Sequence, residues 1–221
     1  MTIRIPAIPM REVLHYLGWR GNPVEPELLE QIREIVKEVQ SEIVPKVIVR
    51  AFSLDEKCGL KDTVFLPAGD DMRRLLADCN EAVLMAATLG AQSERILLRR
   101  QARSGKDALL MDAVLSAAIE AVCDDQEQII RRKYLQENLY LTDRFSPGYG
   151  DMPLEQTKEI CAVLQAEKTI GLHVSQSGIM IPRKSVTAIM GVSAKKMPRR
   201  PSRCAICSMR ESCMLREQKL T

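Results

Sequence analysis

The most restrictive stretch of the sequence is residues 144–153, which read Arg-Phe-Ser-Pro-Gly-Tyr-Gly-Asp-Met-Pro. Two prolines and two glycines in ten residues exclude a regular helix or strand at its centre. Gly148 and Gly150 can adopt positive φ angles or let a ligand approach the backbone. The stretch therefore predicts a loop. It is either a plain surface turn or a binding loop that presents Arg144 and Tyr149 beside exposed backbone groups.

Apolar periodicity on both sides of this loop predicts helices mixed with short strands that are mostly joined by hairpins. There is no alternating strand–helix–strand rhythm, no Gly-x-Gly-x-x-Gly after a strand and no phosphate loop, which disfavours a doubly wound methyltransferase. The predicted fold class is α+β with an antiparallel sheet. We expect helices over residues 10–17, 26–44, 70–79, 93–103, 106–136 and 154–168, and strands over 46–54, 81–89, 172–176, 179–181 and 185–192.

The longest predicted helix, residues 106–136, carries an apolar face rich in small residues that allows close packing against a sheet. Glu120 lies inside this apolar stretch. An acid at such a position either faces water or is kept charged by a cationic partner, such as an ammonium or a sulfonium group. Glu120 is therefore a candidate binding residue.

Charge divides the chain into two unequal parts. The whole chain has 32 basic and 29 acidic residues, a net charge of +3. Residues 195–221 hold eight Lys or Arg and two Glu, so 8 − 2 gives +6 there and −3 in the rest. We predict one domain over residues 1–194 and a basic tail over 195–221. The mildly acidic domain argues against nucleic-acid binding.

The basic tail also holds a Cys-x-x-Cys-x5-Cys pattern formed by Cys204, Cys207 and Cys213. Two thiolates in Cys-x-x-Cys reach one metal from a tight turn, but three ligands are one short of a closed zinc or iron–sulfur site. These cysteines are therefore candidate ligands of an iron–sulfur cluster or zinc. The alternative is an unstructured basic tail with idle thiols.

The expected location is the cytoplasm, without a membrane partner. The first twenty residues lack the uninterrupted apolar core of a signal peptide. The longest apolar run, near residues 82–91, is too short to cross a bilayer. The odd count of seven cysteines makes a disulfide framework a poor fit and favours a reducing compartment.

Four segments together resemble the S-adenosylmethionine-binding activation domain of cobalamin-dependent methionine synthase. Arg144–Tyr149 is similar to that family's Arg-x-x-Pro-Gly-Tyr loop, and Ile-Pro-Arg-Lys-Ser-Val-Thr-Ala-Ile-Met-Gly-Val at 181–192 is similar to its second characteristic segment. The other two segments are Ala-Ala-Thr-Leu-Gly at 86–90 and Ala-Glu-Lys-Thr-Ile-Gly-Leu at 166–172. The resemblance covers roughly residues 8–194 and is closest to stand-alone members of the family.

The resemblance implies a C-shaped domain around a twisted antiparallel sheet, and a role in methionine biosynthesis. Such a domain binds S-adenosylmethionine and supports reductive methylation, or reactivation, of cobalamin that has lost its active oxidation state. The expected partners are a separate cobalamin-bearing methionine synthase or another corrinoid protein, and an electron donor such as a flavodoxin or ferredoxin. The chain would act in the methyltransferase class as a reactivation component that is not active alone. The chain would contribute by positioning the ligand and would need no nucleophile or general base of its own. This fits a sequence without a Ser/His/Asp catalytic set.

The resemblance also implies roles for individual residues. Arg144 would pair with the ligand carboxylate, and Glu120 would hold its ammonium or offset its sulfonium. Ser146 and Gly148 would offer backbone groups to the adenine, and Tyr149 would stack on the ligand or hydrogen-bond to it. The synthase has an aromatic pair where this chain has Met-Gly at 190–191, so that aromatic contact is missing here.

A second function remains open beside reactivation. The same fold could serve as a non-catalytic interaction or electron-transfer module, with a metal or iron–sulfur cluster on the cysteine tail. A measurement of S-adenosylmethionine binding distinguishes the reactivation function from the non-catalytic module.

Overall fold

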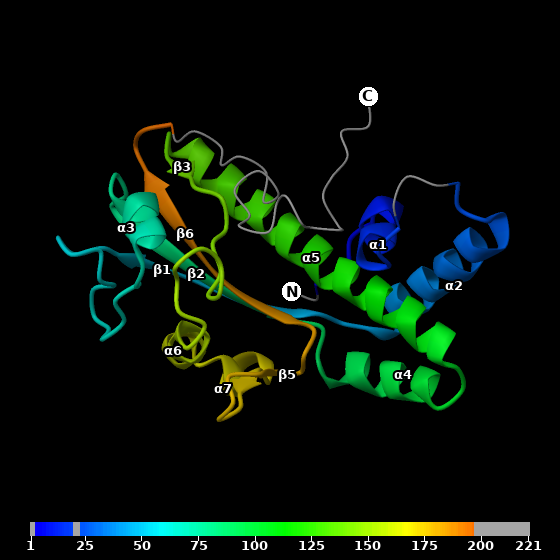
Figure 1. The fold of residues 1–221 in the computed structure, drawn as a ribbon. Coiled ribbons are helices and arrows are strands. Elements are labelled where there is room, and N and C mark those ends of the chain that lie inside the picture. The colour runs from blue at the N-terminus through cyan, green and yellow to red at the C-terminus, as the bar shows by residue number, and fades with distance from the viewer. Residues whose placement is uncertain (1–2, 20–22, 197–221) are drawn as a thin grey trace.

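The computed structural model describes residues 3–19 and 23–196. Its frame is a four-stranded antiparallel sheet with the order β1-β2-β6-β3 (Figure 1). The central strand β2 pairs along its whole length with β1 on one side and β6 on the other. The strands are β1 (Lys46–Ser53), β2 (Glu81–Thr88), β3 (Tyr140–Leu141) and β6 (Ser185–Ser193), with a separate hairpin of β4 (His173–Val174) and β5 (Met180–Ile181). The predicted α+β class with an antiparallel sheet is confirmed.

Helices cover both faces of this sheet (Figure 1). One face packs against α1, α2, α4 and the long α5, and the other packs against α3, α6 and α7. The helices are α1 (Met10–Tyr16), α2 (Pro26–Glu42), α3 (Asp70–Leu76), α4 (Ala91–Gln101), α5 (Gly105–Gln136), α6 (Gln156–Leu164) and α7 (Ala166–Ile170). No helix in the described ranges is long and apolar enough to cross a membrane.

The sequence of strand β2 is a continuous apolar run because helices bury both faces of the strand. Its alternate residues enter two different cores, as the period of two in a strand requires. Val83, Met85 and Ala87 pack in the core beneath α5, whereas Ala82, Leu84 and Ala86 pack in the core beneath α6 and α7.

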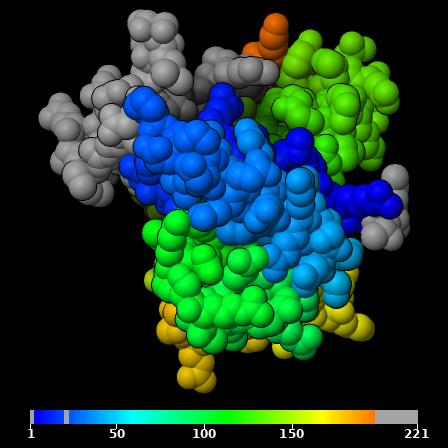
Figure 2. Space-filling view, turned by 90° about the vertical axis from the view of Figure 1, so that its right-hand side faces the viewer, coloured from blue at the N-terminus to red at the C-terminus, as the bar shows by residue number. Residues whose placement is uncertain are grey.

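Helix α5 is the longest element, and its start is set by a side chain. The Asp107 N–H donates to Ser104 Oγ at 3.3 Å, which caps the first turn. Alanines on its buried face, at 113, 117, 118 and 121, let the helix approach the sheet closely. Near the start of α5, helices α2 and α4 lie side by side (Figure 2), joined by Arg99–Glu42 and Arg100–Glu38 ion pairs.

The structure corrects three details of the sequence prediction. The helix predicted over 154–168 is divided into α6 and α7 at Gln165, which adopts a left-handed φ of 53°. The short strand β3 was not predicted. Asp70 and Asp71 begin the helix predicted over residues 70–79 and are N-cap candidates there, but neither side chain caps α3. Instead, their N–H groups donate to the carboxylate of the distant Asp151, at 2.6 and 3.1 Å.

Candidate functional site

A bulge at the edge of the sheet sets the geometry of the site. Leu141 pairs with Val192, and Phe145 pairs with Ile189. Three residues on the first strand, 142–144, therefore lie opposite two on β6, 190–191. One extra residue in an antiparallel pair is a β-bulge, which redirects side chains next to it.

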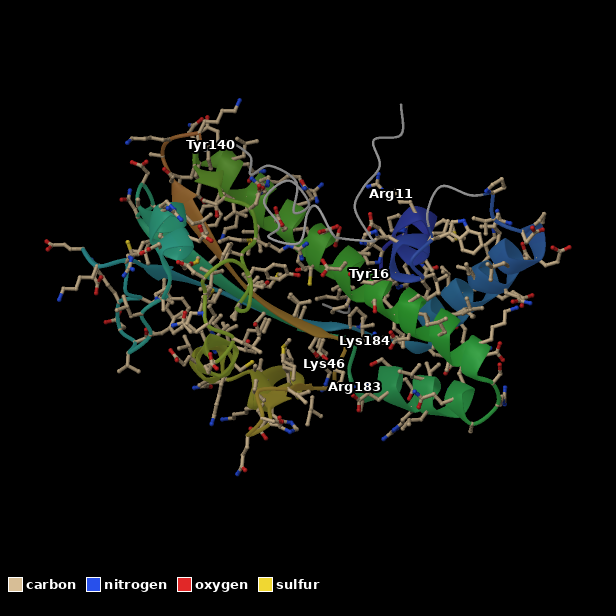
Figure 3. All side chains as sticks on the ribbon, in the orientation of Figure 1. Arg11, Tyr16, Lys46, Tyr140, Arg183 and Lys184 are labelled. Carbon is tan, nitrogen blue, oxygen red and sulfur yellow. The ribbon has the colours of Figure 1, made fainter. Side chains whose placement is uncertain are left out.

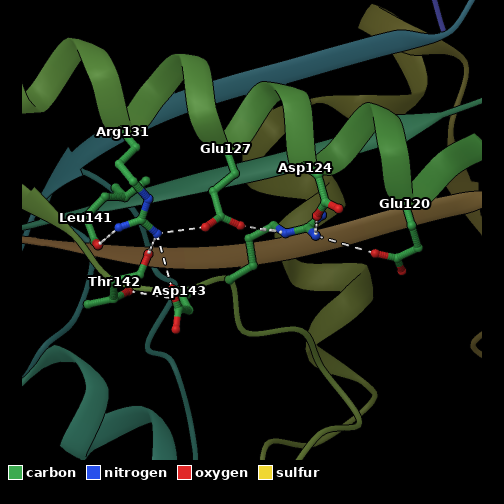
Figure 4. A network of polar contacts seen from close by, with 8 residues as sticks. Glu120, Asp124, Glu127, Arg131, Leu141, Thr142 and Asp143 are labelled. Atoms are coloured by element: carbon green, nitrogen blue, oxygen red, sulfur yellow. Dashed lines mark hydrogen bonds and ion pairs between the residues drawn. The ribbon is translucent and has the colours of Figure 1, made fainter. Parts of the chain in front are cut away.

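Thr142 holds the bulge in place. Its N–H donates to Gly191 O at 2.9 Å, and its Oγ1 accepts the Gly191 N–H at 2.8 Å. Beyond this anchor, Asp143 and Arg144 both extend their side chains to α5 (Figure 4). Two consecutive residues of a regular strand would point to opposite faces. The bulge thus brings a carboxylate and a guanidinium to the same helix.

Arg144 forms ion pairs with three carboxylates of α5, and Figure 4 labels the residues that carry them. Its Nε lies 2.9 Å from Glu127 Oε2, and its Nη2 lies 3.4 Å from Glu120 Oε2 and also contacts Asp124. Residues 120, 124 and 127 follow the spacing of one helix face. The Arg144 side chain is only 7% exposed, so these contacts compensate a guanidinium that has left water.

Arg131, one turn further along α5, extends the network. Its guanidinium lies 2.7 Å from Glu127 Oε1 and 3.3 Å from Asp143 Oδ1. It also donates to the backbone oxygens of Leu141 and Thr142 at the start of the bulge. Glu127 is therefore shared by two arginines, one on its own helix and one on the bulge.

The network carries more acid than base, and Asp124 is its most exposed member. Glu120, Asp124, Glu127 and Asp143 oppose two arginines, so the six side chains sum to −2. The Asp124 side chain is 67% exposed, against 7% for Arg144. Among these six side chains, negative charge is in excess.

Cys123 lies beneath the network and is inert. Its side chain is fully buried, and burial raises the pKa of its thiol to about 12 although the nearby Arg144 guanidinium opposes the shift. A thiol with so high a pKa is a poor nucleophile at neutral pH. Cys123 is therefore a core residue.

The loop after the bulge is an ordered turn. Gly148 N–H donates to Met152 O at 3.0 Å, and Tyr149 N–H donates to Ser146 O at 3.2 Å. Phe145 and Met152 anchor the two ends of the turn in the core, while Tyr149 is 53% exposed between them. Gly148 has a φ of 87° and Gly150 a φ of 54°, which explains why glycine occupies these two positions.

The turn is also tied to a second loop, residues 60–69. The Asp151 carboxylate caps α3 by accepting hydrogen bonds from the N–H groups of Asp70 and Asp71. These hydrogen bonds hold the pKa of the Asp151 carboxyl below its usual range. Gln156 donates to Leu66 O and accepts from Ala68 N–H, both at 2.9 Å. The position of Tyr149 therefore depends on contacts outside its own loop.

The segment 181–192, which carries the second motif, has a different role in the fold. Lys184 Nζ lies 2.8 Å from Asp112 Oδ1 on α5 and donates to Ser116 Oγ. The neighbouring Arg183 N–H donates to Glu94 on α4, and both side chains lie at the turn before β6 (Figure 3). This segment ties β6 to the two helices.

The structure places the predicted site residues as follows. Glu120 and Arg144 are brought together as an ion pair, so a guanidinium of the chain itself is a cationic partner of Glu120. Ser146, Gly148 and Tyr149 share the turn that follows Arg144. Sequence reasoning missed the other four members of the network, although charges at 120, 124, 127 and 131 repeat with helical spacing. These four are Asp124, Glu127, Arg131 and Asp143.

The tail is the one part of the prediction that the structure does not reach. Cys204, Cys207 and Cys213 lie outside the described residues, so the proposed metal site remains a prediction. Within the described ranges, no group of three or more His, Cys, Asp or Glu residues could hold a metal ion.

Comparison with known proteins agrees with this architecture. Residues 91–197 match the family model of the vitamin B12 dependent methionine synthase activation domain. A crystal structure of the MetH reactivation domain bound to AdoHcy matches with a TM-score of 0.60 at 15% identity, over 90% of this chain and 79% of that one. No curated protein matches. The matched family region contains both Glu120 and the 144–149 loop, and the resemblance predicted from four motifs is confirmed.

Proposed function

We propose that this chain, which resembles the activation domain of cobalamin-dependent methionine synthase, binds S-adenosylmethionine beside the Arg144 network and supports reactivation of a corrinoid protein. The observation that carries the proposal is the anionic network, with a net charge of −2, at the base of an ordered Pro-Gly-Tyr turn. S-adenosylmethionine carries a sulfonium, an ammonium, a carboxylate and a planar base. The network and the turn offer a complement to each of these groups.

Glu120 is the proposed acceptor for the positive end of the ligand. Its side chain is 23% exposed, and it lies at the end of the network away from Arg131. The contact between Glu120 and Arg144 is the longest of the three that Arg144 makes to carboxylates, at 3.4 Å. Glu120 can therefore turn toward an ammonium or sulfonium at little cost to Arg144.

Arg144 is the proposed partner of the ligand carboxylate. Its planar fork suits a carboxylate, but protein carboxylates already engage it. Asp124 is the most exposed of these carboxylates, and the ligand would take its place. Glu127, which is 14% exposed and also bound by Arg131, would continue to hold the guanidinium in position.

The turn is the proposed adenine site. Ser146 and Gly148 would present backbone groups to the base, and the exposed ring of Tyr149 would stack on it or hydrogen-bond to the ligand. The hydrogen bonds of Asp151 and Gln156 fix the turn before the ligand arrives, which lowers the entropic cost of binding.

The contribution of the chain to the reaction is orientation. Cobalamin on a partner protein, such as a methionine synthase or another corrinoid protein, would supply the nucleophile after one-electron reduction by a donor such as a flavodoxin or ferredoxin. The residues described here would hold the ligand so that its methyl group points outward to that partner. No general base is required of this chain.

Calorimetric titration of S-adenosylmethionine into anaerobically purified protein tests the proposal. Glu120→Gln keeps the shape of the side chain and removes its charge, and we expect it to weaken binding at least about tenfold, or about 1.4 kcal/mol. Glu30→Gln is the matched control, because Glu30 forms an exposed ion pair with Arg33 on α2. The unmodified chain is titrated with and without a corrinoid protein. Absence of binding up to millimolar ligand in both cases would exclude the proposal.

A further inference from the structure

Strand β1 forms an open edge of the main sheet. In the described part of the chain it pairs with β2 alone, and the short β3 lies at the opposite edge. In an antiparallel pair, alternate residues direct both backbone groups to the partner strand, and the residues between them direct both groups away. An edge strand therefore presents a row of N–H and C=O groups to whatever lies beside the sheet.

Two hydrogen bonds fix which residues of β1 face outward. The Leu89 N–H donates to Lys184 O at 2.9 Å, so the odd-numbered residues of β2 bond β6 and its even-numbered residues bond β1. Each even-numbered residue of β2 lies opposite an even-numbered residue of β1. The odd-numbered residues of β1 therefore point away from β2. Ser53 agrees with this alternation, because its oxygen accepts the Lys61 N–H at 2.9 Å.

The open part of the edge consists of Val47, Val49 and Ala51. Among the residues that the structure describes, no backbone hydrogen bond reaches the outward N–H and C=O groups of these three. Val49 is 36% exposed, and Ala51 is exposed as well. Pro45, which has no N–H, precedes this row, and the hydrogen bond at the end of β1 closes it on the other side. The edge therefore accommodates one short strand.

The charge of β1 indicates which kind of strand fits. Its eight residues contain two cations, Lys46 and Arg50, and no acid. Both side chains are exposed, and within the described ranges neither forms an ion pair or a side-chain hydrogen bond. They lie on the same face as Ile48, because residues two apart in a strand share a face. An added strand with carboxylates opposite these cations would gain cross-strand ion pairs.

The same charges disfavour the two occupants that the chain itself could supply. A second β1 paired antiparallel about Val49 would bring the two copies of Arg50 to neighbouring diagonal positions, where like charges repel. Residues 197–221 hold six Lys or Arg and two Glu, so 6 − 2 gives +4. A segment of that charge is repelled by the cations of β1 as well. The edge therefore favours a strand from another protein.

We propose that β1 binds an extended acidic segment of a partner protein, which joins the four-stranded sheet as an additional strand antiparallel to β1. The backbone of Val47, Val49 and Ala51 supplies the hydrogen bonds, and Lys46 and Arg50 select an acidic sequence. Strands β2 and β6 separate this edge from the bulge beside β3. The interaction is therefore independent of the function proposed above.

A synthetic peptide with the sequence Val-Thr-Glu-Thr-Val-Thr-Glu tests this pairing. Antiparallel to β1, it places its glutamates opposite Arg50 and Lys46, and its valines opposite Phe52 and Ile48. The fluorescently labelled peptide is titrated with the full chain at low salt, and binding is followed by fluorescence anisotropy. We expect saturable binding with a Kd below about 1 mM, weakened at least about tenfold when lysine replaces both glutamates.

Hydrogen exchange locates the bound peptide. The amides of Val47, Val49 and Ala51 point away from β2, so they should exchange more slowly when the peptide is bound. The amides of Ile48 and Arg50 already bond β2 and should change little. Peptide binding without slower exchange at the three outward amides would refute the edge as its site.

Two variants of the chain test the backbone and the charges separately. Val49→Pro removes an outward N–H that β2 does not use, and should weaken binding of the glutamate peptide at least about tenfold. A charge reversal guards against a proline that disturbs the strand. Lys46→Glu combined with Arg50→Glu should make the lysine peptide the tighter ligand. Arg33→Glu, which reverses a charge on the exposed face of α2, should leave the preference for glutamate unchanged.

The remaining outcomes also decide the proposal. Absence of saturable binding up to about 1 mM peptide, or equal binding of the glutamate and lysine peptides, would overturn it. A dimer of the full chain in sedimentation velocity that Val49→Pro dissociates would assign the edge to a second copy and overturn it too. A chain that binds the glutamate peptide but not S-adenosylmethionine would support the acidic strand and refute only the proposed function.

Discussion

The carboxylate of Glu127 joins two arginines, with Oε2 at 2.9 Å from Arg144 Nε and Oε1 at 2.7 Å from Arg131 Nη2. Its side chain is 14% exposed, so it acts largely out of water. This one group links α5 to the bulge that follows β3, and the proposed binding geometry depends on it.

Removing the charge of Glu127 is expected to destabilise the fold. Glu127→Gln removes the carboxylate that two partly buried guanidiniums share. Buried charge without a compensating partner is costly. Because Arg144 keeps Glu120 and Asp124, we expect a loss of about 1–3 kcal/mol in the free energy of unfolding, measured by urea denaturation. The exposed ion pair of Glu30 with Arg33 provides the control. Glu30→Gln should lower the free energy of unfolding by less than about 0.5 kcal/mol.

A methyl group at Gly191 should disturb the packing of α3 on β6. A Cβ there would lie 2.5 Å from Cys79 Sγ and 3.1 Å from Leu76 Cδ2. Gly191→Ala is therefore expected to lower the free energy of unfolding by about 1–3 kcal/mol. Adding Cys79→Ala removes the nearest atom and should recover part of this loss. A double variant no more stable than Gly191→Ala alone would contradict the steric explanation.

The cap that Asp151 provides can be followed by hydrogen exchange. Asp151→Ala removes the acceptor for the Asp70 and Asp71 N–H groups, so both amides should exchange faster with solvent. The Asp107 amide, which is capped by Ser104 at the start of α5, serves as the internal reference. Unchanged exchange at Asp70 and Asp71 would show that the cap is not formed in solution.

Alkaline pH should destabilise the chain through buried groups with a raised pKa, and Cys123 and Tyr134 have the highest pKa values among them. Burial raises the pKa of Cys123 from 9.0 to about 12, and burial together with Glu81 raises the pKa of Tyr134 from 10.0 to about 12. Above about pH 9 the unfolded chain loses these protons before the folded chain does. The folded state then binds more protons, so its stability falls as pH rises.

Thermal unfolding measured from pH 7 to pH 11 checks this dependence. The slope should be flatter in the double variant Cys123→Ala and Tyr134→Phe, which lacks both titrating groups. An equally steep decline in that variant would assign the effect to other residues.

The regular elements were predictable because their patterns are long. Helix α5 and strand β2 each bury a continuous set of side chains, and both appear in the sequence as extended apolar runs. β3 has two residues and shows no periodicity at all. Its place in the sheet results from pairing with β6, which is a tertiary contact.

The candidate site was predictable only in part, because part of its geometry also comes from tertiary contacts. The 144–149 loop was visible through its proline and glycines, and Glu120 through its position within an apolar stretch. That Arg144 would turn toward Glu120 depends on the bulge, which comes from a mismatch of one residue between two segments more than forty positions apart. The second motif, at 181–192, was visible as a family-like segment, but the ion pair between its Lys184 and Asp112 on α5 is a tertiary contact that the sequence does not reveal.

The bulge at 142–144 makes the site sensitive to the length of the chain at one point. Removing a single codon there would restore a regular strand and send one of the two charged side chains to the opposite face of the sheet. The pairing of β2 with β6 would be kept, because it involves the other edge of β6. The ion-pair network is therefore one insertion or deletion away from being lost or gained, while the fold that supports it is kept.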